Sequence, residues 1–179
     1  MKKNKAVIVF LLRFFISYIV LSSAYNWYLS TYTAKETNYK TDAITRLVAN
    51  QTVAVANFLG FNFSTEQHQE ELSYKLYTDN KYVARVVEGC NSISVIILFW
   101  AFIIAFAGKI KHTIIFGIVG ALLIYTINLL RIVILTLAVD TYPEHTHFLH
   151  HIVFPAIIYS FTFVLWIVWV KYFALKKKA

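Results

Sequence analysis

The sequence is poor in the residue types that mark flexible chains and disulfide-bonded domains. Its 179 residues include one cysteine, five glycines and two prolines. A single cysteine excludes an internal disulfide. The chain is instead 59% hydrophobic and 17% aromatic, which is the composition of neither a disordered chain nor an ordinary soluble domain. The composition therefore predicts an integral membrane protein.

Four stretches of the chain are apolar enough to cross a bilayer core of about 30 Å, which takes roughly 20 helical residues. They are residues 6–28, 92–107, 113–139 and 152–170. We therefore expect an all-α integral membrane protein, built as a bundle of about four transmembrane helices. The whole chain, residues 1–179, would form a single membrane domain.

The first stretch has an alternative interpretation as a cleaved signal peptide. Leu21-Ser22-Ser23-Ala24 ends in small residues after an apolar run, as a cleavage site does. However, the apolar run is long for a signal peptide. It also continues into Tyr25, Trp27 and Tyr28, which suit an aromatic anchoring belt at the membrane surface. These features favour a retained span.

Acidic residues are scarce, and their positions predict the topology. All nine lie in two polar segments, residues 35–88 and 140–151. Lysines occupy the other ends of the spans, at Lys2, Lys3, Lys5, Lys109, Lys111, Lys171 and Lys176 to Lys178. The positive-inside rule places these lysines and both termini in the cytoplasm and the acidic segments outside. The net charge of +8 then needs no nucleic-acid partner. We expect a multi-pass protein of the cytoplasmic (inner) membrane, surrounded by lipid.

The outer segment between the first two spans, residues 29–89, has the pattern of a small extracytoplasmic cap. Thr41-Asp42 offers an N-cap for an amphipathic helix that Gly60 would end. After it, Leu72 to Leu76 alternates with polar residues, and Lys81 to Val87 is rich in β-branched and aromatic residues. This pattern predicts a β-hairpin. An irregular loop is the alternative.

The one cysteine, Cys90, lies where this polar segment meets the second span, in Glu88-Gly89-Cys90-Asn91-Ser92. A thiol at a water–lipid boundary can be partly exposed. If its residue opens a helix, the positive end of the helix dipole favours the thiolate. Gly89 allows a close approach of substrate. The alternative is that Cys90 is a small buried hydrophobe.

Arg131 is the one charged residue inside the third span. A central arginine in lipid costs about 2.5–3.5 kcal/mol on insertion scales, so such residues usually face the protein interior and mark function. We expect it in the outer half of the span. Asn128 lies one turn away on the same face and could orient the guanidinium or the substrate. Alternatively, Arg131 snorkels to the surface or pairs with Glu88.

Four histidines, His145, His147, His150 and His151, lie in the short outer segment before the fourth span. Such a cluster could bind zinc or copper. It could also supply one catalytic proton-transfer histidine, or be a solvated loop at the membrane surface. No second cluster of cysteine or carboxylate ligands accompanies it, so we expect no metal ion and no other cofactor.

The predicted topology brings three of these positions to one side of the membrane. Cys90 opens the second span from outside, Arg131 lies in the outer half of the third, and His150 precedes the fourth from the same side. A thiol, a guanidinium and an imidazole can therefore meet in the outer leaflet. This convergence favours a cysteine enzyme with Cys90 as nucleophile.

These motifs resemble those of the exosortase/archaeosortase family, membrane transpeptidases that process C-terminal sorting signals. The similar pieces are Glu88-Gly89-Cys90-Asn91-Ser92, Asn128-x-x-Arg131-Ile132, and His150 before Phe154-Pro155-x-x-x-Tyr159. The short chain and this ending resemble the small exosortase F type (XrtF) of Bacteroidota. The residue after Asn91 is commonly glycine in the family and is Ser92 here. Many exosortases are also longer, with more spans.

The resemblance implies a catalytic set of Cys90, Arg131 and His150, with His147 or His151 as alternatives to His150. Substrate-binding roles are expected for Asn128, Glu88 and Asn91. The implied activity cleaves the C-terminal sorting signal of secreted proteins at the outer membrane face and transfers them to an acceptor through a Cys90 thioester. The alternatives are a membrane cysteine protease without transfer and a non-catalytic subunit that binds a partner helix.

Overall fold

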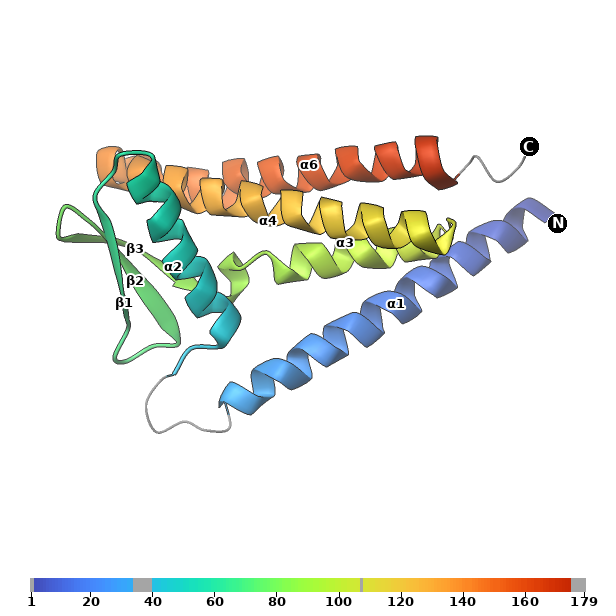
Figure 1. Cartoon of the computed structure of the whole chain (residues 1–179), viewed down its shortest axis with the longest axis horizontal. Helices are drawn as coiled ribbons and strands as arrows, with labels where there is room; N and C mark the ends of the chain where they lie inside the picture. The colour runs from blue at the N-terminus through green and yellow to red at the C-terminus, as the bar shows by residue number, and fades with distance from the viewer. Residues whose placement is uncertain (1, 34–39, 107, 175–179) are drawn as a thin grey trace.

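The computed structural model describes residues 2–33, 40–106 and 108–174. Most of these residues are helical. The long helices form an elongated bundle, and a short helix with a small sheet covers one end of it (Figure 1). We call this end region, residues 40–87, the cap. Three predicted features lie outside the described residues: residues 34–39 of the predicted outer segment, Ala107 at the end of the second predicted span, and the lysines at 176–178.

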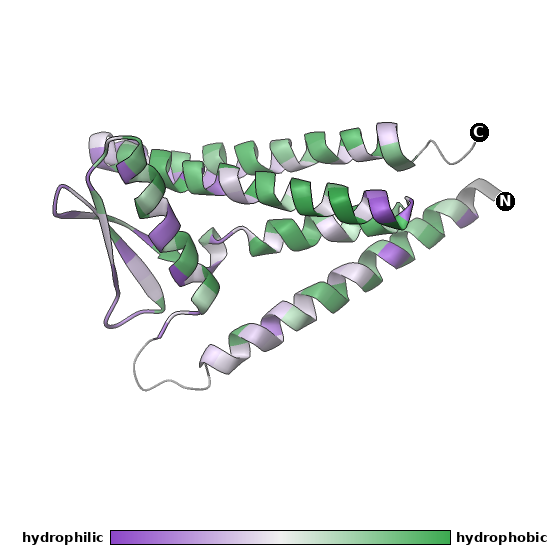
Figure 2. Cartoon of the chain, in the orientation of Figure 1, coloured by the Kyte–Doolittle hydropathy of each residue, from purple (hydrophilic) through white to green (hydrophobic). Residues whose placement is uncertain are grey.

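Among the described residues, three helices are long and apolar enough to cross a membrane. They are Lys5–Tyr32 within α1 (Lys2–Thr33), the whole of α4 (Ile110–Thr141), and the run Pro143–Ala174, which contains α6 (Phe154–Trp169). They correspond to the first, third and fourth predicted spans. Many of their apolar side chains are exposed. Figure 2 shows that much of the length of these helices is hydrophobic. The protein is therefore a membrane protein with several membrane-spanning helices.

The second predicted span, residues 92–107, contains a shorter helix. This helix, α3 (Ile93–Ala105), has 13 residues. At 1.5 Å per residue it is about 20 Å long, which is less than the roughly 30 Å of a bilayer core. It packs against α1, α4 and α6. The count of four spans therefore stays a prediction.

The chain between α4 and α6 is helical, where the sequence suggested a polar loop. After α4 it forms the turns η2 (Pro143–His145) and α5 (Thr146–Phe148) and the π-helical turn η3 (Leu149–Val153). This π-turn precedes Pro155, which has no N–H to give and whose ring crowds the carbonyl four residues earlier. Widening the turn relieves that conflict, and such π-bulges are frequent at functional sites.

The bundle core is built from aromatic rings and large aliphatic side chains that face small residues. Its fully buried members include Phe99, Ile103, Ile124 and Trp169. A Cβ added at Gly120 would overlap the ring of Phe99. The ring therefore lies directly against the α4 backbone. This is the close approach that glycine allows between helices in membranes.

The cap begins with α2 (Ala43–Phe58). Asp42 is its N-cap, because the carboxylate Oδ1 accepts hydrogen bonds from the backbone N–H groups of Ile44 and Thr45, both at 3.0 Å. Gly60 follows the helix with a φ of 91°, a left-handed value that ends a helix.

A three-stranded antiparallel sheet follows, with the strand order β1 (Phe63–Gln67), β2 (Ser73–Thr78), β3 (Lys81–Val87). Strands β2 and β3 form the hairpin expected from the sequence. Its two-residue turn, Asp79-Asn80, has φ values of 50° and 66°, as a type I′ turn requires. Strand β1 was not predicted. The described chain is mostly helical outside this small sheet, which is consistent with the expected all-α membrane protein. The extracytoplasmic position of the cap stays a prediction.

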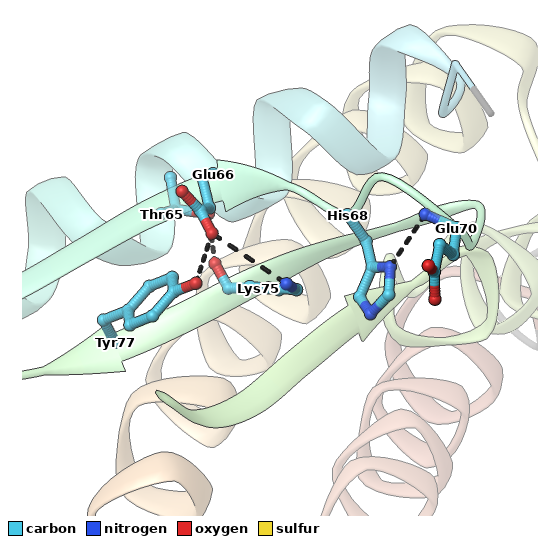
Figure 3. Close-up of polar contacts among 6 residues, drawn as sticks. All are labelled: Thr65, Glu66, His68, Glu70, Lys75 and Tyr77. Carbon is cyan, nitrogen blue, oxygen red and sulfur yellow. Dashed lines mark hydrogen bonds and ion pairs between the residues drawn. The ribbon is translucent and has the colours of Figure 1, made fainter. Parts of the chain in front are cut away.

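Polar contacts link β1 to β2 away from the helices (Figure 3). The Tyr77 hydroxyl donates to Glu66, and this bond raises the pKa of the phenol because the deprotonated form loses it. Lys75 Nζ lies 4.0 Å from the same carboxylate. Thr65 Oγ1 donates to the Lys75 carbonyl at 2.8 Å. Glu66, Lys75 and Tyr77 lie on the same face and form the polar side of the sheet.

The other side of the sheet packs with α2 on the last turns of α4. Their shared core includes Val48 of α2, Leu76 of β2 and Ile132 of α4. At the end of α4, Lys81 Nζ of β3 lies 2.7 Å from Asp140 Oδ1. About the last third of α4 is therefore covered by protein rather than exposed.

Candidate active site

Cys90, Arg131 and His150 line one cavity of about 180 Å³ at the junction of the cap and the bundle. They come from three separate elements. Cys90 ends the 3-10 turn η1 (Glu88–Cys90), Arg131 is on α4, and His150 is on the π-turn η3. Each of the three side chains is partly buried. The residues that the sequence grouped by topology thus face a common space.

Cys90 is a free thiol held by its backbone rather than by its side chain. The Asn128 side chain of α4 donates through Nδ2 to the Cys90 carbonyl oxygen at 2.7 Å. The sequence suggested that the cysteine opens a helix. The structure differs, because α3 begins at Ile93, after a break at Ser92. The thiol therefore lies just before the helix instead of within its first turn.

Ser92 makes this break with a φ of 62°, a left-handed value that favours glycine. Its hydroxyl donates to the Asn91 carbonyl at 2.6 Å. Position 92 thus has a backbone conformation that glycine adopts most easily. A serine adopts it here at some cost in strain.

Asn91 is 1% exposed and connects three helices. Its Nδ2 donates to the Tyr25 hydroxyl of α1 at 2.8 Å and to Thr45 Oγ1 of α2 at 3.4 Å. Its Oδ1 accepts from the Ile93 N–H at 3.0 Å. Glu88 is partly buried and interacts with the same Tyr25 hydroxyl. Tyr25, which the sequence suggested as a membrane anchor, is therefore part of the support of the Cys90 turn.

Arg131 presents an uncompensated charge to the cavity. Its Nη1 donates to Asn128 Oδ1 at 3.3 Å, and its Nε is buried without a hydrogen-bond partner. Among the described residues, no ion pair includes Arg131. The pairing with Glu88 that the sequence left open is thus not formed. A cation in this position can bind an anionic or strongly polarised oxygen.

Asn128 is fully buried and connects the other two groups. One end of its amide holds the Cys90 carbonyl and the other holds the Arg131 guanidinium. The side-chain amides of Asn128 and Asn91 form hydrogen bonds with other residues of the protein. These bonds indicate that the two residues position the Cys90 turn. Direct substrate contact by Asn128, Asn91 and Glu88 stays a prediction.

Of the four clustered histidines, His150 is the one that lines the cavity. His147 and His151 are exposed, with their rings stacked at 4.3 Å, and His151 Nδ1 lies 3.1 Å from the His147 carbonyl. His145 is exposed beside Glu144. Within the described residues, no three histidine, cysteine or carboxylate side chains gather as a metal site.

Sequence reasoning missed most of the cavity wall. Leu135 and Val139 follow Arg131 at helical spacing, and Thr146 precedes His150 by four residues. Helical periodicity from the two predicted residues could have identified these three. Nothing in the sequence pointed to the wall from the sheet, which consists of Leu76 and Val83 to Val86.

Comparison with known proteins gives one match. The family model described as Transmembrane exosortase (Exosortase_EpsH) matches residues 7–169, which includes all the cavity residues. No curated protein and no solved structure matches the chain.

Proposed function

Because the chain belongs to the transmembrane exosortase family, we propose that it is a membrane-embedded cysteine transpeptidase. It cleaves the C-terminal sorting signal of secreted proteins and transfers them to an acceptor. Family membership suggests a membrane transpeptidase in protein sorting. The catalytic set, the thioester and the exosortase F subtype are the finer parts of the proposal.

In the proposed reaction, the Cys90 thiolate attacks a backbone carbonyl just outside the substrate's C-terminal anchor helix. The carbonyl oxygen takes the negative charge, and the Arg131 guanidinium stabilises it. His150 gives a proton to the leaving amine, so the peptide bond breaks and a thioester remains on Cys90. His150 then accepts a proton from the acceptor, which attacks the thioester and releases the thiolate.

The observation that carries this proposal is the shared cavity of Cys90, Arg131 and His150. A structural arginine would be paired. Arg131 instead keeps a buried Nε without a partner and lies outside every ion pair of the described chain. A group that stabilises a developing negative charge needs donor atoms that are not already paired within the protein. The outward orientation of the cavity rests on the distribution of lysines and carboxylates along the sequence.

The test is a processing assay in the native membrane. Its substrate is a secreted protein with one C-terminal span and a basic tail, encoded beside this chain and tagged on both sides of the span. Cys90→Ala and Cys90→Ser should abolish the size shift and leave the enzyme in the membrane. Ser94→Ala, an exposed position on the first turn of α3, is the matched control. Wild-type processing by Cys90→Ala would leave the non-catalytic subunit as the better account.

Transfer and hydrolysis differ in the product. Mass spectrometry of the mature substrate's C-terminus should find an added acceptor group. A free carboxylate in every molecule would instead make the chain a protease. Replacement of each histidine by alanine sharpens the assignment, since processing should be lost at His150 and kept at His147 and His151.

A further inference from the structure

The strand that leads to Cys90 is an edge strand. In the sheet order β1-β2-β3, β3 pairs with β2 on one side only. Among the described residues, no backbone hydrogen bond joins its other side to any element. In a strand, every second residue directs its N–H and C=O away from the paired neighbour. β3 thus offers unpaired backbone donors and acceptors along its free edge.

The cavity runs along this free edge. Four consecutive residues of β3, Val83 to Val86, line it. Successive side chains of a strand point to opposite faces of the sheet, so a space that borders both Arg85 and Val86 reaches the edge of the strand. Leu76 of the middle strand β2 borders the same space on one face of the sheet. Val83 is also an extra residue, because Tyr82 pairs with Tyr77 and Ala84 with Leu76. Such bulges are common at sheet edges next to active sites.

We propose that the substrate's cleavage segment binds as an additional, extended strand on the free edge of β3, which delivers its scissile carbonyl to Cys90. This inference rests on the proposed function. The strand continues directly through Glu88 and Gly89 to the thiol. A peptide held along β3 is thereby carried into the space between Cys90, Arg131 and His150.

The shape and polarity of the cavity fit a peptide backbone. At about 180 Å³ it is smaller than the roughly 300–1,000 Å³ of pockets that enclose drug-sized ligands. The side chains around it are mostly apolar. Its polar side chains are the three predicted catalytic residues together with Arg85, Thr136 and Thr146. Backbone pairing supplies affinity in strand addition, and small flanking pockets supply side-chain selectivity. Leu135 and Val139 on the opposite wall favour small or aliphatic substrate side chains.

The experiment measures alkylation of Cys90 in the purified full-length protein. The probe is acetyl-Ala-Ala-Ala-Ala-chloromethyl ketone, with four variants in which one amide N–H at a time is replaced by an ester oxygen. The ester removes one donor and keeps the shape. We expect slower labelling at alternate positions, by about fivefold each, since one backbone hydrogen bond contributes about 1 kcal/mol. The intervening esters should label like the parent peptide.

Iodoacetamide, which is too small to use the strand edge, gives the reference rate for the thiol. Reaction of each peptide with glutathione checks that the five probes are equally reactive in solution, and Cys90→Ala shows that the label is on Cys90. Equal labelling by all five peptides would overturn the inference. An equal loss at every position would also overturn it. So would a labelling rate that falls when phospholipid is added to the sample and does not depend on the position of the ester. That last result would make the cavity a site for an acyl chain.

The outcome of the alkylation experiment does not depend on the outcome of the processing assay. Alternating labelling together with normal processing by Cys90→Ala would keep the strand-edge site and reject the catalytic proposal. Uniform labelling together with lost processing in Cys90→Ala would reject the strand-edge site and keep the catalytic proposal.

Discussion

The helical bundle and the cap junction use different interactions to fix their residues. In the bundle, rings such as Phe99 and Trp169 press against glycine backbone, and the buried groups are almost entirely apolar. At the junction, buried amides join separate elements, as Asn91 does for α1, α2 and α3 and Asn128 does for α4 and the Cys90 turn. Packing without polar contacts sets distances between helices, while hydrogen bonds also set direction. A nucleophile must be oriented toward its substrate, and Cys90, the proposed nucleophile, lies at the hydrogen-bonded junction.

The junction also contains a partly buried cation, Arg131, whose Nε has no hydrogen-bond partner. Arg131 lies among apolar wall residues with one hydrogen bond to Asn128 and no carboxylate partner there. Lys81, an exposed cation near the end of α4, does have one in Asp140. The contrast agrees with the role proposed for Arg131, in which some stability is given up for function.

The largest effect should come from Arg131→Met, which removes the charge and keeps much of the volume. We expect processing to fall by about 10²–10³-fold, the loss typical for one oxyanion-binding donor. The melting temperature in detergent should stay the same or rise, because a partly buried charge without a carboxylate is removed. Arg85→Met is the control: it lines the same cavity, yet its charge is paired with Glu71. Equal losses in both variants would mean that charge in general, rather than Arg131, matters.

Asn128→Ala should lower both the stability of the protein and its processing activity. It leaves the Cys90 carbonyl and the Arg131 guanidinium without their partner, and unsatisfied buried groups cost about 1–3 kcal/mol. Chemical unfolding should show that loss of stability, and processing should fall about tenfold or more. Thr126→Ala on the exposed face of the same helix is the control. A stable but inactive Asn128→Ala would show that its bonds serve the site alone.

Gly120→Ala should disturb the bundle and spare the site. The new methyl group meets the Phe99 ring, and overpacking of a core costs about 1–3 kcal/mol. We expect a lower melting temperature with unchanged processing at temperatures where the protein is folded. The double variant Gly120→Ala with Phe99→Leu should recover part of the stability. A processing defect in folded Gly120→Ala would mean that the bundle and the junction are coupled.

The smallest effect should follow Asp42→Ala at the start of α2. Loss of an N-cap costs about 1 kcal/mol, because two backbone N–H groups lose their acceptor. Hydrogen exchange should increase in the first turn of α2 and not in α4 or α6. Asp42→Asn, which can still accept those bonds, should behave like the wild type. Faster exchange throughout the chain would show that the cap stabilises the bundle.

Local sequence signals predicted several elements well. Asp42 and Gly60 bound α2 because capping chemistry depends on residues within one turn. The β2–β3 hairpin follows from alternation and from Asp79-Asn80. Strand β1 was missed because it is held by pairing with β2 rather than by a pattern of its own. The length of α3 was overestimated because apolar composition does not reveal a break such as that at Ser92.

The catalytic residues were predicted from two features: their residue types are rare in membrane helices, and the predicted topology places them on the same side of the membrane. A lone thiol, a charge within an apolar helix and a histidine next to a span are unusual in any membrane chain, and the lysine distribution put them on one face. Their placement in one cavity agrees with that prediction, and their roles stay proposals. The support by Tyr25 and Thr45 had no sequence signal, because it joins residues 91, 25 and 45 through one amide.

The sequence by itself determined which segments are apolar enough for the membrane and which residues carry unusual chemistry, because hydropathy, charge and residue type belong to each segment separately. Only the tertiary structure decided that β3 forms a wall beside Cys90, that Asn128 connects the thiol's turn to Arg131, and that His150 rather than His147 faces them. Those facts depend on contacts between residues far apart in the chain. Such contacts are set by how whole elements pack, and no local pattern encodes them.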